Sequence, residues 1–600
     1  MTIFNLLTLL GGLAIFLFGM DVMGKALERQ AGGKLQSMLN RITSSPLTGF
    51  LLGLGVTAVI QSSSATTVML VGFVNSGIMQ LRQAIPVIMG SNVGTTVTAW
   101  ILSLTGIDGE SIFIQLLKPS SFTPILALIG IVLCMFCKSD KKKGIGTIML
   151  GFAVLMFGME TMSGAMEPLK DEAWFTSLFL KFSNPILGVL VGTLLTAIIQ
   201  SSSASVGILQ ALSATGIVTY ASAVPIIMGQ NIGTCVTALI SSVGANKDAK
   251  RVAMVHLYFN IIGVVLFLCL FYGINAIVPW GFLNESASEL GIAVVHTTFN
   301  VVATGVLLPF NRVLEKLAIM TVRDKKSAGE QNAVLDERLF TSPGVAAERA
   351  RAVACDMFEM SRTMLVNALD VTEKWDASKA KLAEECEMHV DQYEDMLGTY
   401  LVKLSAYQLN HNDNCTVNTL LHVIGDFERI GDHALNLLKT AQEIEDKKIN
   451  FSSQAQEELR VLRKAVSDIV DRTEKAFVNR DLALAGKVEP QEQVIDGLVR
   501  EVKKRHVERL RAGSCTIEYG FVLNDLLTNF ERIADHCSNI AVEMIQVSED
   551  TYNTHKFLGE LKAGTSEASG DFERRYERYR ERYAFPDGDE DNSVKDDKKE

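Results

Sequence analysis

The sequence predicts an all-α protein in two parts. The first part is a polytopic membrane domain with inverted-topology repeats and broken hairpin helices, and the second is a soluble helical-bundle domain of two three-helix repeats. Three observations predict this fold: a charge imbalance between the two halves, a gapless internal repeat in the first half, and helical periodicity with a second repeat in the second half.

Charged residues are distributed unevenly along the 600 residues. Residues 1–310 contain 15 Lys and Arg against 12 Asp and Glu, whereas residues 311–600 contain 41 against 55. No charged side chain occurs from Phe182 to Asn246. Because a charge at the centre of a bilayer is costly, we interpret 1–310 as a transmembrane transporter domain. Residues 1–20 are interpreted as a retained membrane helix, since they lack a basic leader and a cleavage site.

The strongest signal is a repeat at a constant offset of 139 residues, without insertion or deletion, over about 18–101. Two motifs recur in it. The serine runs are Gln61–Ala65 and Gln200–Ala204, both Gln-Ser-Ser-Ser-Ala, and the Asn-Thr motifs are Gly90–Thr96 and Gly229–Cys235. The repeats are expected at about 3–105 and 145–243. Two large repeats in a membrane domain are typical of secondary transporters.

The charges flanking the repeats predict that the two copies are inverted in the membrane. Residues 25–41 carry four basic side chains and one acid, while their counterpart, 164–184, carries two basic side chains and three acids. Basic loops favour the cytoplasmic side, so the copies should face opposite ways, and everything after residue 310 should be cytoplasmic. The segments 47–76 and 185–215 are expected to be hairpins. Seven full crossings are expected near 3–20, 84–105, 122–137, 145–162, 224–243, 252–279 and 291–310.

The serine runs interrupt apolar segments at membrane depth, where an irregular backbone must line a cavity or lie inside protein. Half-helix N-termini and hydroxyl groups suit an oxyanion, and the hydroxyl and amide oxygens suit sodium. Neither motif contains Lys or Arg, so a bound dianion would need cations as countercharge. The alternative is that these residues only pack helices together. The candidate substrate- and sodium-binding residues are Gln61, Ser62, Ser63, Ser64, Thr66, Asn92, Thr95, Gln200, Ser201, Ser202, Ser203, Asn231 and Thr234.

These paired motifs resemble those of the type II sodium–phosphate cotransporter family, over about 1–310. The resemblance implies an inverted-repeat fold, sodium-coupled phosphate movement, and serine runs that contact phosphate and sodium. Two positions depart from the repeat: Cys235 stands where the first copy has Thr96, and Ser205 where it has Thr66. His256 and His296 are interpreted as hydrogen-bonded core groups, with a proton relay as the alternative.

The second half is expected to contain a linker at 311–346, a helical domain at 347–560, and a charged, partly disordered tail at 561–600. Residues Phe427–His433 recur as Phe530–His536 at an offset of 103. This pattern resembles the PhoU-like family of phosphate-regulatory domains, over about 347–545. The resemblance raises a metal site as an alternative to an ordinary solvated face, with a divalent or iron-type metal. The candidate ligands, spaced i and i+4 on two helices, are Glu428, Asp432, Glu531 and Asp535.

The sequence therefore predicts sodium-dependent transport of inorganic phosphate across the cell membrane by alternating access, with a cytoplasmic regulatory domain. Two alternatives stay open: an exporter that relieves excess cytoplasmic phosphate, and a membrane phosphate sensor that does not transport. No nucleotide loop, nucleophile motif or zinc signature points to an enzyme. The expected partners are phosphate, sodium and the lipid bilayer, without nucleic acid, and the chain could form a homo-oligomer.

Overall fold

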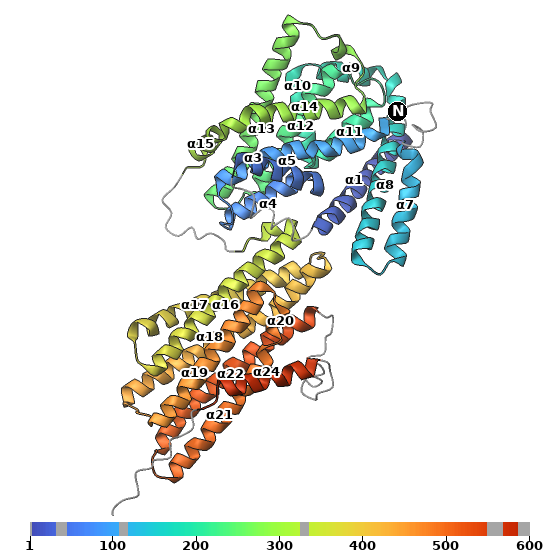
Figure 1. Cartoon of the computed structure of the whole chain (residues 1–600). Helices are drawn as coiled ribbons and strands as arrows, with labels where there is room; N and C mark the ends of the chain where they lie inside the picture. The colour runs from blue at the N-terminus through green and yellow to red at the C-terminus, as the bar shows by residue number, and fades with distance from the viewer. Residues whose placement is uncertain (1–2, 32–44, 107–117, 324–334, 549–567, 586–600) are drawn as a thin grey trace, which may run out of the picture. The chain divides into compact units, whose positions relative to one another are not determined.

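The computed structural model describes residues 3–31, 45–106, 118–323, 335–548 and 568–585 (Figure 1). Over these ranges the chain is helical, with one isolated β-bridge between Thr219 and Ser286 and no strand. It divides into two compact units. Unit 1 comprises Met1–Ala346 and Tyr407–Asp413, and unit 2 comprises Ala347–Ala406 and Asn414–Glu600. The predicted all-α fold is confirmed.

In its described residues, unit 1 contains seven helices that are long and apolar enough to cross a membrane, and they follow the predicted crossings in number and order. Large apolar side chains such as Phe136, Phe157 and Ile277 lie exposed on them, as a lipid-facing surface requires. The chain is therefore a multi-pass membrane protein. The seven spans are Ile3–Gln30, Leu81–Gly106, Pro119–Phe136, Asp140–Leu169, Tyr220–Ser241, Lys247–Ile277 and Glu289–Thr321.

Helices α1 (Ile3–Ala31) and α8 (Asp140–Met166) are equivalent across the repeat and pack closely side by side. A methyl group at Gly19 would collide with the backbone of Leu155, and one at Gly158 with the backbone of Phe16. Residue numbers therefore rise along α1 as they fall along α8, so the helices are antiparallel. Phe16 and Leu155 are equivalent across the repeat, as are Gly19 and Gly158, so each contact has its mirror. Equivalent helices that run antiparallel place the two repeats in opposite orientations.

Each serine run lies at the turn of a helical hairpin. Helices α3 (Pro46–Ile60) and α4 (Ser63–Asn75) flank the first run, and α10 (Pro185–Ile199) and α11 (Ser202–Ser213) flank the second. Gly49 and Gly53 of α3 pack against the first half of α5 (Leu81–Leu102), while Gly94 further along α5 packs against Thr57. Helices α3 and α5 are therefore parallel. Because α4 connects the end of α3 with the start of α5, it must run back alongside them.

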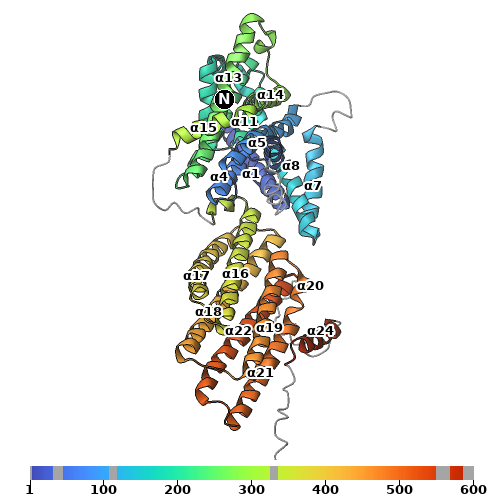
Figure 2. The same cartoon turned by 60° about the vertical axis from the view of Figure 1, so that its left-hand side comes forward.

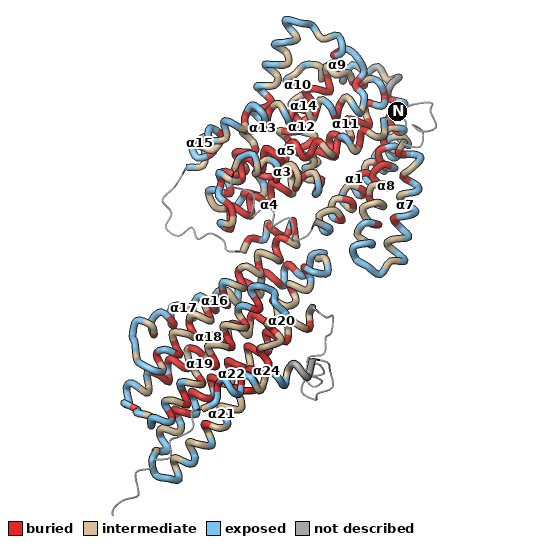
Figure 3. Tube along the Cα trace, viewed as in Figure 1, coloured by how far each residue is buried: buried red, intermediate tan, exposed pale blue. Residues whose placement is uncertain are grey.

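The two helices that carry the Asn-Thr motifs form the centre of unit 1. In the most apolar 18-residue stretch of each helix, 78% of the residues are buried in α5 and 72% in α12 (Tyr220–Ser241). The corresponding values are 17% in α1 and 11% in α7 (Pro119–Phe136). Figure 3 shows the same contrast, with α5 largely red and α7 largely pale. Helices α13 (Lys247–Ile277) and α14 (Glu289–Leu307) pack against both α5 and α12. The repeated motifs thus occupy the most protected part of the unit.

The segment expected to be a linker, 311–346, is folded where it is described. Helix α15 (Asn311–Thr321) follows α14 through a short 3-10 turn, and a second 3-10 turn spans Glu337–Thr341. Asp336 is buried and accepts a hydrogen bond from Asn75 at 2.6 Å, and Arg338 donates to the carbonyl of Ser241 at 2.6 Å. These polar contacts join the segment to the ends of α4 and α12, which are distant in sequence. Composition alone could not reveal them, so the charged and small residues suggested a linker.

Unit 2 contains two three-helix repeats, which Figure 2 shows in a second view. The first consists of α16 (Pro343–Glu373), α17 (Ala377–Ser405) and α18 (His411–Lys447). The second consists of α19 (Ser453–Asn479), α21 (Val488–Arg511) and α22 (Ile517–Ser548). Two reciprocal hydrogen bonds join α18 to α22: His433 Nδ1 lies 2.9 Å from Asn529 Oδ1, and His536 Nδ1 lies 2.8 Å from Asp426 Oδ1. These pairs are equivalent at the offset of 103, so the repeats are related by a local two-fold.

The charged tail expected at 561–600 contains a helix in its described part. Residues 568–582 form helix α24, which packs on α21, and Tyr583 at its end is buried. The Tyr583 hydroxyl donates to Asp468 at 2.7 Å, and the Arg472 guanidinium stacks over Tyr579. Helically spaced tyrosines supply the apolar surface that the charge content concealed.

Prediction on the helix contact. Gly53 and Gly55 are close neighbours in α3, but only Gly53 faces the carbonyl of Val87. Gly53→Ala should lower the melting temperature of the purified protein in detergent, because overpacking costs about 1–3 kcal/mol. Gly55→Ala, which meets open space, should leave it unchanged or raise it, because Ala favours a helix by about 0.5–1 kcal/mol. Equal effects of the two changes would contradict the close packing of α3 on α5.

Candidate functional site

The glutamine of each serine run adopts the same unusual backbone conformation. Gln61 has φ 60° and Gln200 has φ 59°, in the left-handed region that non-glycine residues rarely occupy. Each ends its helix there, with a backbone N–H that donates to the carbonyl four residues earlier, of Thr57 or Thr196. A residue with a side chain is kept at a position that glycine would occupy more readily. Backbone strain of this kind is often found at functional sites.

The second residue of each run caps the next helix. The hydroxyl of Ser62 accepts from the N–H of Ala65 at 3.1 Å, and that of Ser201 accepts from Ala204 at 3.2 Å. Helices α4 and α11 thus begin at the breaks, and their first turns direct N–H groups and the positive end of the helix dipole there. An anion at either break would meet these donors.

Thr98 connects the two serine runs. Ser203 Oγ of the second run donates to Thr98 Oγ1 at 3.4 Å, and Thr98 Oγ1 donates to Gln61 Oε1 of the first run at 2.8 Å. All three residues are buried. Two segments far apart in the sequence therefore meet through one side chain of α5. Thr98 was absent from the predicted site, although its counterpart Thr237 at the repeat offset was a usable signal.

The first Asn-Thr motif is bound by α13. Asn92 Nδ2 donates to Asn260 Oδ1 at 3.2 Å, and Asn92 Oδ1 lies 3.4 Å from His256 Nε2. Asn260 Nδ2 in turn donates to Cys235 Sγ of the second motif at 3.3 Å. His256 is thus a hydrogen-bonded core group, as predicted, whereas His296 is buried but neither of its ring nitrogens has a hydrogen-bond partner among the described residues. His256 and Asn260 belong to the site but lie outside the 139-residue repeat, so its symmetry could not identify them.

The other predicted side chains differ in their surroundings. Asn231 donates to the carbonyl of Ile227 at 2.9 Å, and Thr95 and Thr234 donate to carbonyls of their own helices, at 3.1 and 3.0 Å. Their bonds are those of ordinary helix-packing residues. Gln200 is exposed, and Ser62, Ser64 and Ser201 are half-buried. The predicted residues that are buried are Gln61, Ser63, Thr66, Asn92, Thr95, Ser202, Ser203, Asn231 and Thr234.

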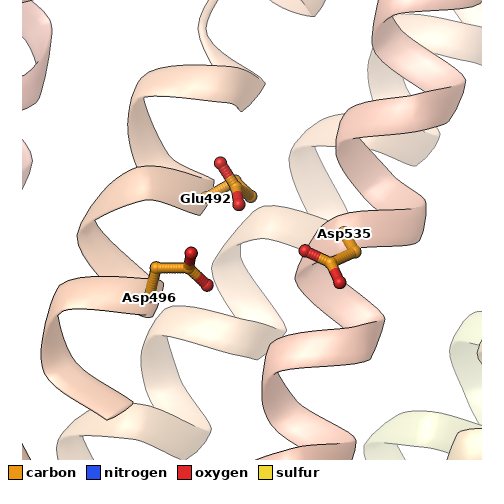
Figure 4. A group of neighbouring side chains, drawn as sticks. All are labelled: Glu492, Asp496 and Asp535. Atoms are coloured by element: carbon orange, nitrogen blue, oxygen red, sulfur yellow. The ribbon is translucent and has the colours of Figure 1, made fainter. Parts of the chain in front are cut away.

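In unit 2, Glu492 and Asp496 of α21 lie beside Asp535 of α22 (Figure 4). One carboxylate oxygen from each lies within 4.8 Å of the others. Burial raises the pKa of Asp535, and Arg532 opposes that rise. Three carboxylates from two helices are a suitable ligand set for a hard divalent cation. We call Glu492, Asp496 and Asp535 the carboxylate cluster.

The carboxylate cluster differs from the set that the sequence suggested. Glu531 lies outside it and pairs with Lys503 at 3.5 Å. In the first repeat, burial raises the pKa of Glu428 to about 7, with Asp432 and Asp391 adding to the rise. Each acidic group is therefore built from neighbouring helices of one repeat, and the two predicted faces do not combine. The sequence did contain a signal for the observed grouping. The Glu-x-x-x-Asp spacing that was noted at Glu428 and Glu531 also occurs at Glu387 and Glu492.

A comparison with known protein families identifies the family of unit 1. The family model described as Na+/Pi-cotransporter matches residues 15–164 and again 155–292, one match for each repeat. The chain belongs to the Na+/Pi-cotransporter family. The PhoU domain model likewise matches twice in the second half, at 354–441 and 459–544. The two resemblances noted in the sequence are thus confirmed.

Relatives of this Na+/Pi-cotransporter family member match it over very different lengths. "Uncharacterized protein YqeW" of Bacillus subtilis is 31% identical over 315 residues, which is 52% of this chain and 96% of that protein. "Putative inorganic phosphate export protein YjbB" of Escherichia coli K12 is 23% identical over 557 residues, 91% of this chain and 98% of that one. "Sodium-dependent phosphate transport protein 2A" of Rattus norvegicus is 42% identical over 99 residues, 16% of this chain and 15% of that one.

Among solved structures, PhoU from Pseudomonas aeruginosa aligns with a TM-score of 0.32 and 22% identity. The alignment covers 34% of this family member and 97% of the PhoU chain.

Prediction on the carboxylate cluster. If it binds a divalent cation, manganese should raise the melting temperature of the full-length protein, because the ligand binds only the folded state. Asp535→Asn should reduce both that rise and the metal retained per chain in elemental analysis. Glu531→Gln removes a charge from the same helix but leaves the cluster intact, so it should retain both. The assignment fails if the two variants lose metal equally or if the unmodified protein binds none.

Proposed function

We propose that this protein moves inorganic phosphate across the cell membrane together with sodium ions by alternating access, and that unit 2 is a cytoplasmic regulatory domain. One observation carries the proposal. Two inverted repeats bring their helix breaks together through Thr98, and the hairpins and Asn-Thr motifs around them contain no charged side chain.

Phosphate suits the breaks because it presents both acceptors and, when protonated, a donor. Hydroxyl groups such as those of Ser63, Ser202 and Ser203 can both donate and accept. The first turns of α4 and α11 add backbone N–H groups and the positive ends of two helix dipoles. These partial charges support an anion but fall short of a countercharge for a dianion. Cations must therefore accompany phosphate.

The buried amide side chains of unit 1 favour such cations. Gln210 donates its amide nitrogen to the carbonyls of Ala99 and Glu289, and Gln230 donates its own to Ser205. Among the described residues, the amide oxygens Gln210 Oε1 and Gln230 Oε1 are buried without a hydrogen-bond partner. Amide oxygens turned inward repel an anion and attract a hard cation such as sodium. These oxygens, beside hairpins and Asn-Thr motifs that carry no charge, support symport.

Alternating access follows from the repeat geometry. Helices α1 and α8 run antiparallel with reciprocal glycine contacts, so the two repeats are related by a local two-fold. In inverted-repeat carriers, a rocking motion about such an axis exposes a central site to one side and then to the other. Thr98 lies at that centre, between the two serine runs.

Net export is the second candidate function. Two relatives that align with this chain over 98% of their own length are named "Putative inorganic phosphate export protein YjbB". The site geometry is compatible with either direction, since a carrier follows its gradients. A membrane phosphate sensor that does not transport is the third candidate function. The metal-binding carboxylate cluster and the cytoplasmic location of unit 2 belong to the proposal as its regulatory part.

Prediction on coupling. In proteoliposomes of the full-length protein, radiolabelled phosphate should move down an imposed sodium gradient and reverse when that gradient is reversed. Replacing sodium with choline at fixed pH should reduce the flux by at least about tenfold, because a dianion without its cations should bind poorly. Undiminished flux in choline would contradict symport. Phosphate binding with no flux under any gradient would support the sensor.

Matched serine variants locate the site in the same assay. Ser63→Ala and Ser202→Ala should abolish most of the flux while the protein remains monodisperse. Ser76→Ala is the control, because Ser76 is buried at the other end of α4 and donates to the carbonyl of Gly72 at 2.8 Å. Normal flux in the first two variants would mean that the serine runs only pack helices.

A further inference from the structure

A second, shorter repeat lies outside the two copies already described. Residues Val255–Asn260 read Val-His-Leu-Tyr-Phe-Asn, and Val295–Asn300 read Val-His-Thr-Thr-Phe-Asn, at an offset of 40. The first copy lies on α13 and the second on α14. Helix α13 packs against α12 and α4, while α14 packs against their counterparts, α5 and α11. The local two-fold of unit 1 therefore also relates α13 to α14.

The polar side chains of the α13 copy are almost fully paired. Asn260 Oδ1 accepts from Asn92, and Asn260 Nδ2 donates to Cys235 Sγ and to the carbonyl of His256. His256 Nε2 lies 3.4 Å from Asn92 Oδ1. One turn further along this face stands Val264, which is apolar. The α13 face thus supplies protein partners for both atoms of its asparagine amide.

The α14 copy is buried as deeply but lacks these partners. His296 is 1% exposed, Asn300 0% and Thr304 3%. Asn300 Nδ2 donates to the carbonyl of His296 at 2.9 Å, as the equivalent atom of Asn260 does to His256. Asn300 Oδ1, Thr304 Oγ1 and both His296 ring nitrogens have no hydrogen-bond partner among the described residues. Unpaired polar atoms are expensive at membrane depth.

Thr304 also departs from the behaviour of other threonines in the unit. A threonine in a membrane helix usually donates to the carbonyl four residues earlier, as Thr95, Thr234 and Thr297 do. Thr304 makes no such bond, and its buried hydroxyl neither donates to nor accepts from any described residue. Residues four apart lie on one helical face, with Cβ atoms about 5–6 Å apart. The oxygens of Asn300 and Thr304 can therefore approach one ion.

We propose that Asn300 Oδ1 and Thr304 Oγ1 bind a sodium ion. The Asn300 atom without a partner is its amide oxygen, an acceptor, and an oxygen acceptor suits a hard cation better than an anion. On α13 the equivalent oxygen accepts from the Asn92 amide, whereas Asn231, the counterpart of Asn92, donates to its own helix at 2.9 Å. The inference rests on the proposed function, since it names residues that bind the coupling ion.

The test uses purified full-length protein and needs no transport. Melting temperatures in detergent are compared in sodium chloride and in choline chloride at equal ionic strength. The unmodified protein should melt higher in sodium, and Thr304→Val should lose most of that difference. Valine keeps the shape of threonine and copies the residue that α13 has at this place. Thr297→Val makes the same change on the same helix, where Thr297 already bonds Ala293 and Trp100, and should retain the difference.

Sodium-dependent flux gives the second reading. Thr304→Val should raise the sodium concentration for half-maximal phosphate flux by at least about fivefold, which is about 1 kcal/mol, while Thr297→Val leaves it unchanged. A sodium effect on melting that survives both Thr304→Val and Asn300→Ser overturns the site. If the unmodified protein shows no sodium-dependent flux but Thr304→Val still abolishes the sodium effect on melting, the transport proposal fails and the sodium site stands.

Discussion

The membrane half depends on one constraint: two helices are interrupted where no water can satisfy the backbone. In a bilayer such a break is stable only inside protein. Gln61 and Gln200 adopt a left-handed backbone conformation there. The surrounding helices supply the hydrogen-bond partners that water would otherwise provide. The glycines of α3, α5, α10 and α12 allow the backbones of each hairpin and its neighbouring helix to pack against each other, as where Gly90 faces Phe50 and Gly229 faces Val189. The burial of α5 and α12 follows from this need.

The two halves satisfy their breaks unequally, although their backbones are alike. In the first repeat Thr57 donates to Thr66 at 3.0 Å, whereas the counterparts Thr196 and Ser205 both have buried hydroxyls without partners among the described residues. Thr98 bonds Gln61, whereas its counterpart Thr237 has no partner there. The α13 and α14 copies show the same contrast. A carrier that works by alternating access must hold its two halves in different conformations at any moment. The unequal hydrogen bonding of the two repeats is one way in which they differ.

The sequence was sufficient where a feature depends on local pattern. An apolar segment interrupted by Gln-Ser-Ser-Ser predicts a break, and a fixed offset predicts that the break occurs twice. Thr98 was missed because a single threonine in an apolar helix resembles a packing residue until its neighbours are known. The pairing of Glu531 with Lys503, and of Asp535 with Glu492 and Asp496, depends on how α21 packs on α22. Spacing along one helix holds no information on that packing.

The central claim is that a charge-free site made of serine runs holds phosphate only with sodium. Equilibrium binding of radiolabelled phosphate to the purified protein, in sodium chloride and in choline chloride, tests it without reference to direction or turnover. The account predicts tight binding in sodium, with an affinity that falls as sodium is withdrawn, and binding at least about tenfold weaker in choline. Equal affinity in the two salts would contradict it, because phosphate would then be held by the hydroxyl and backbone groups alone.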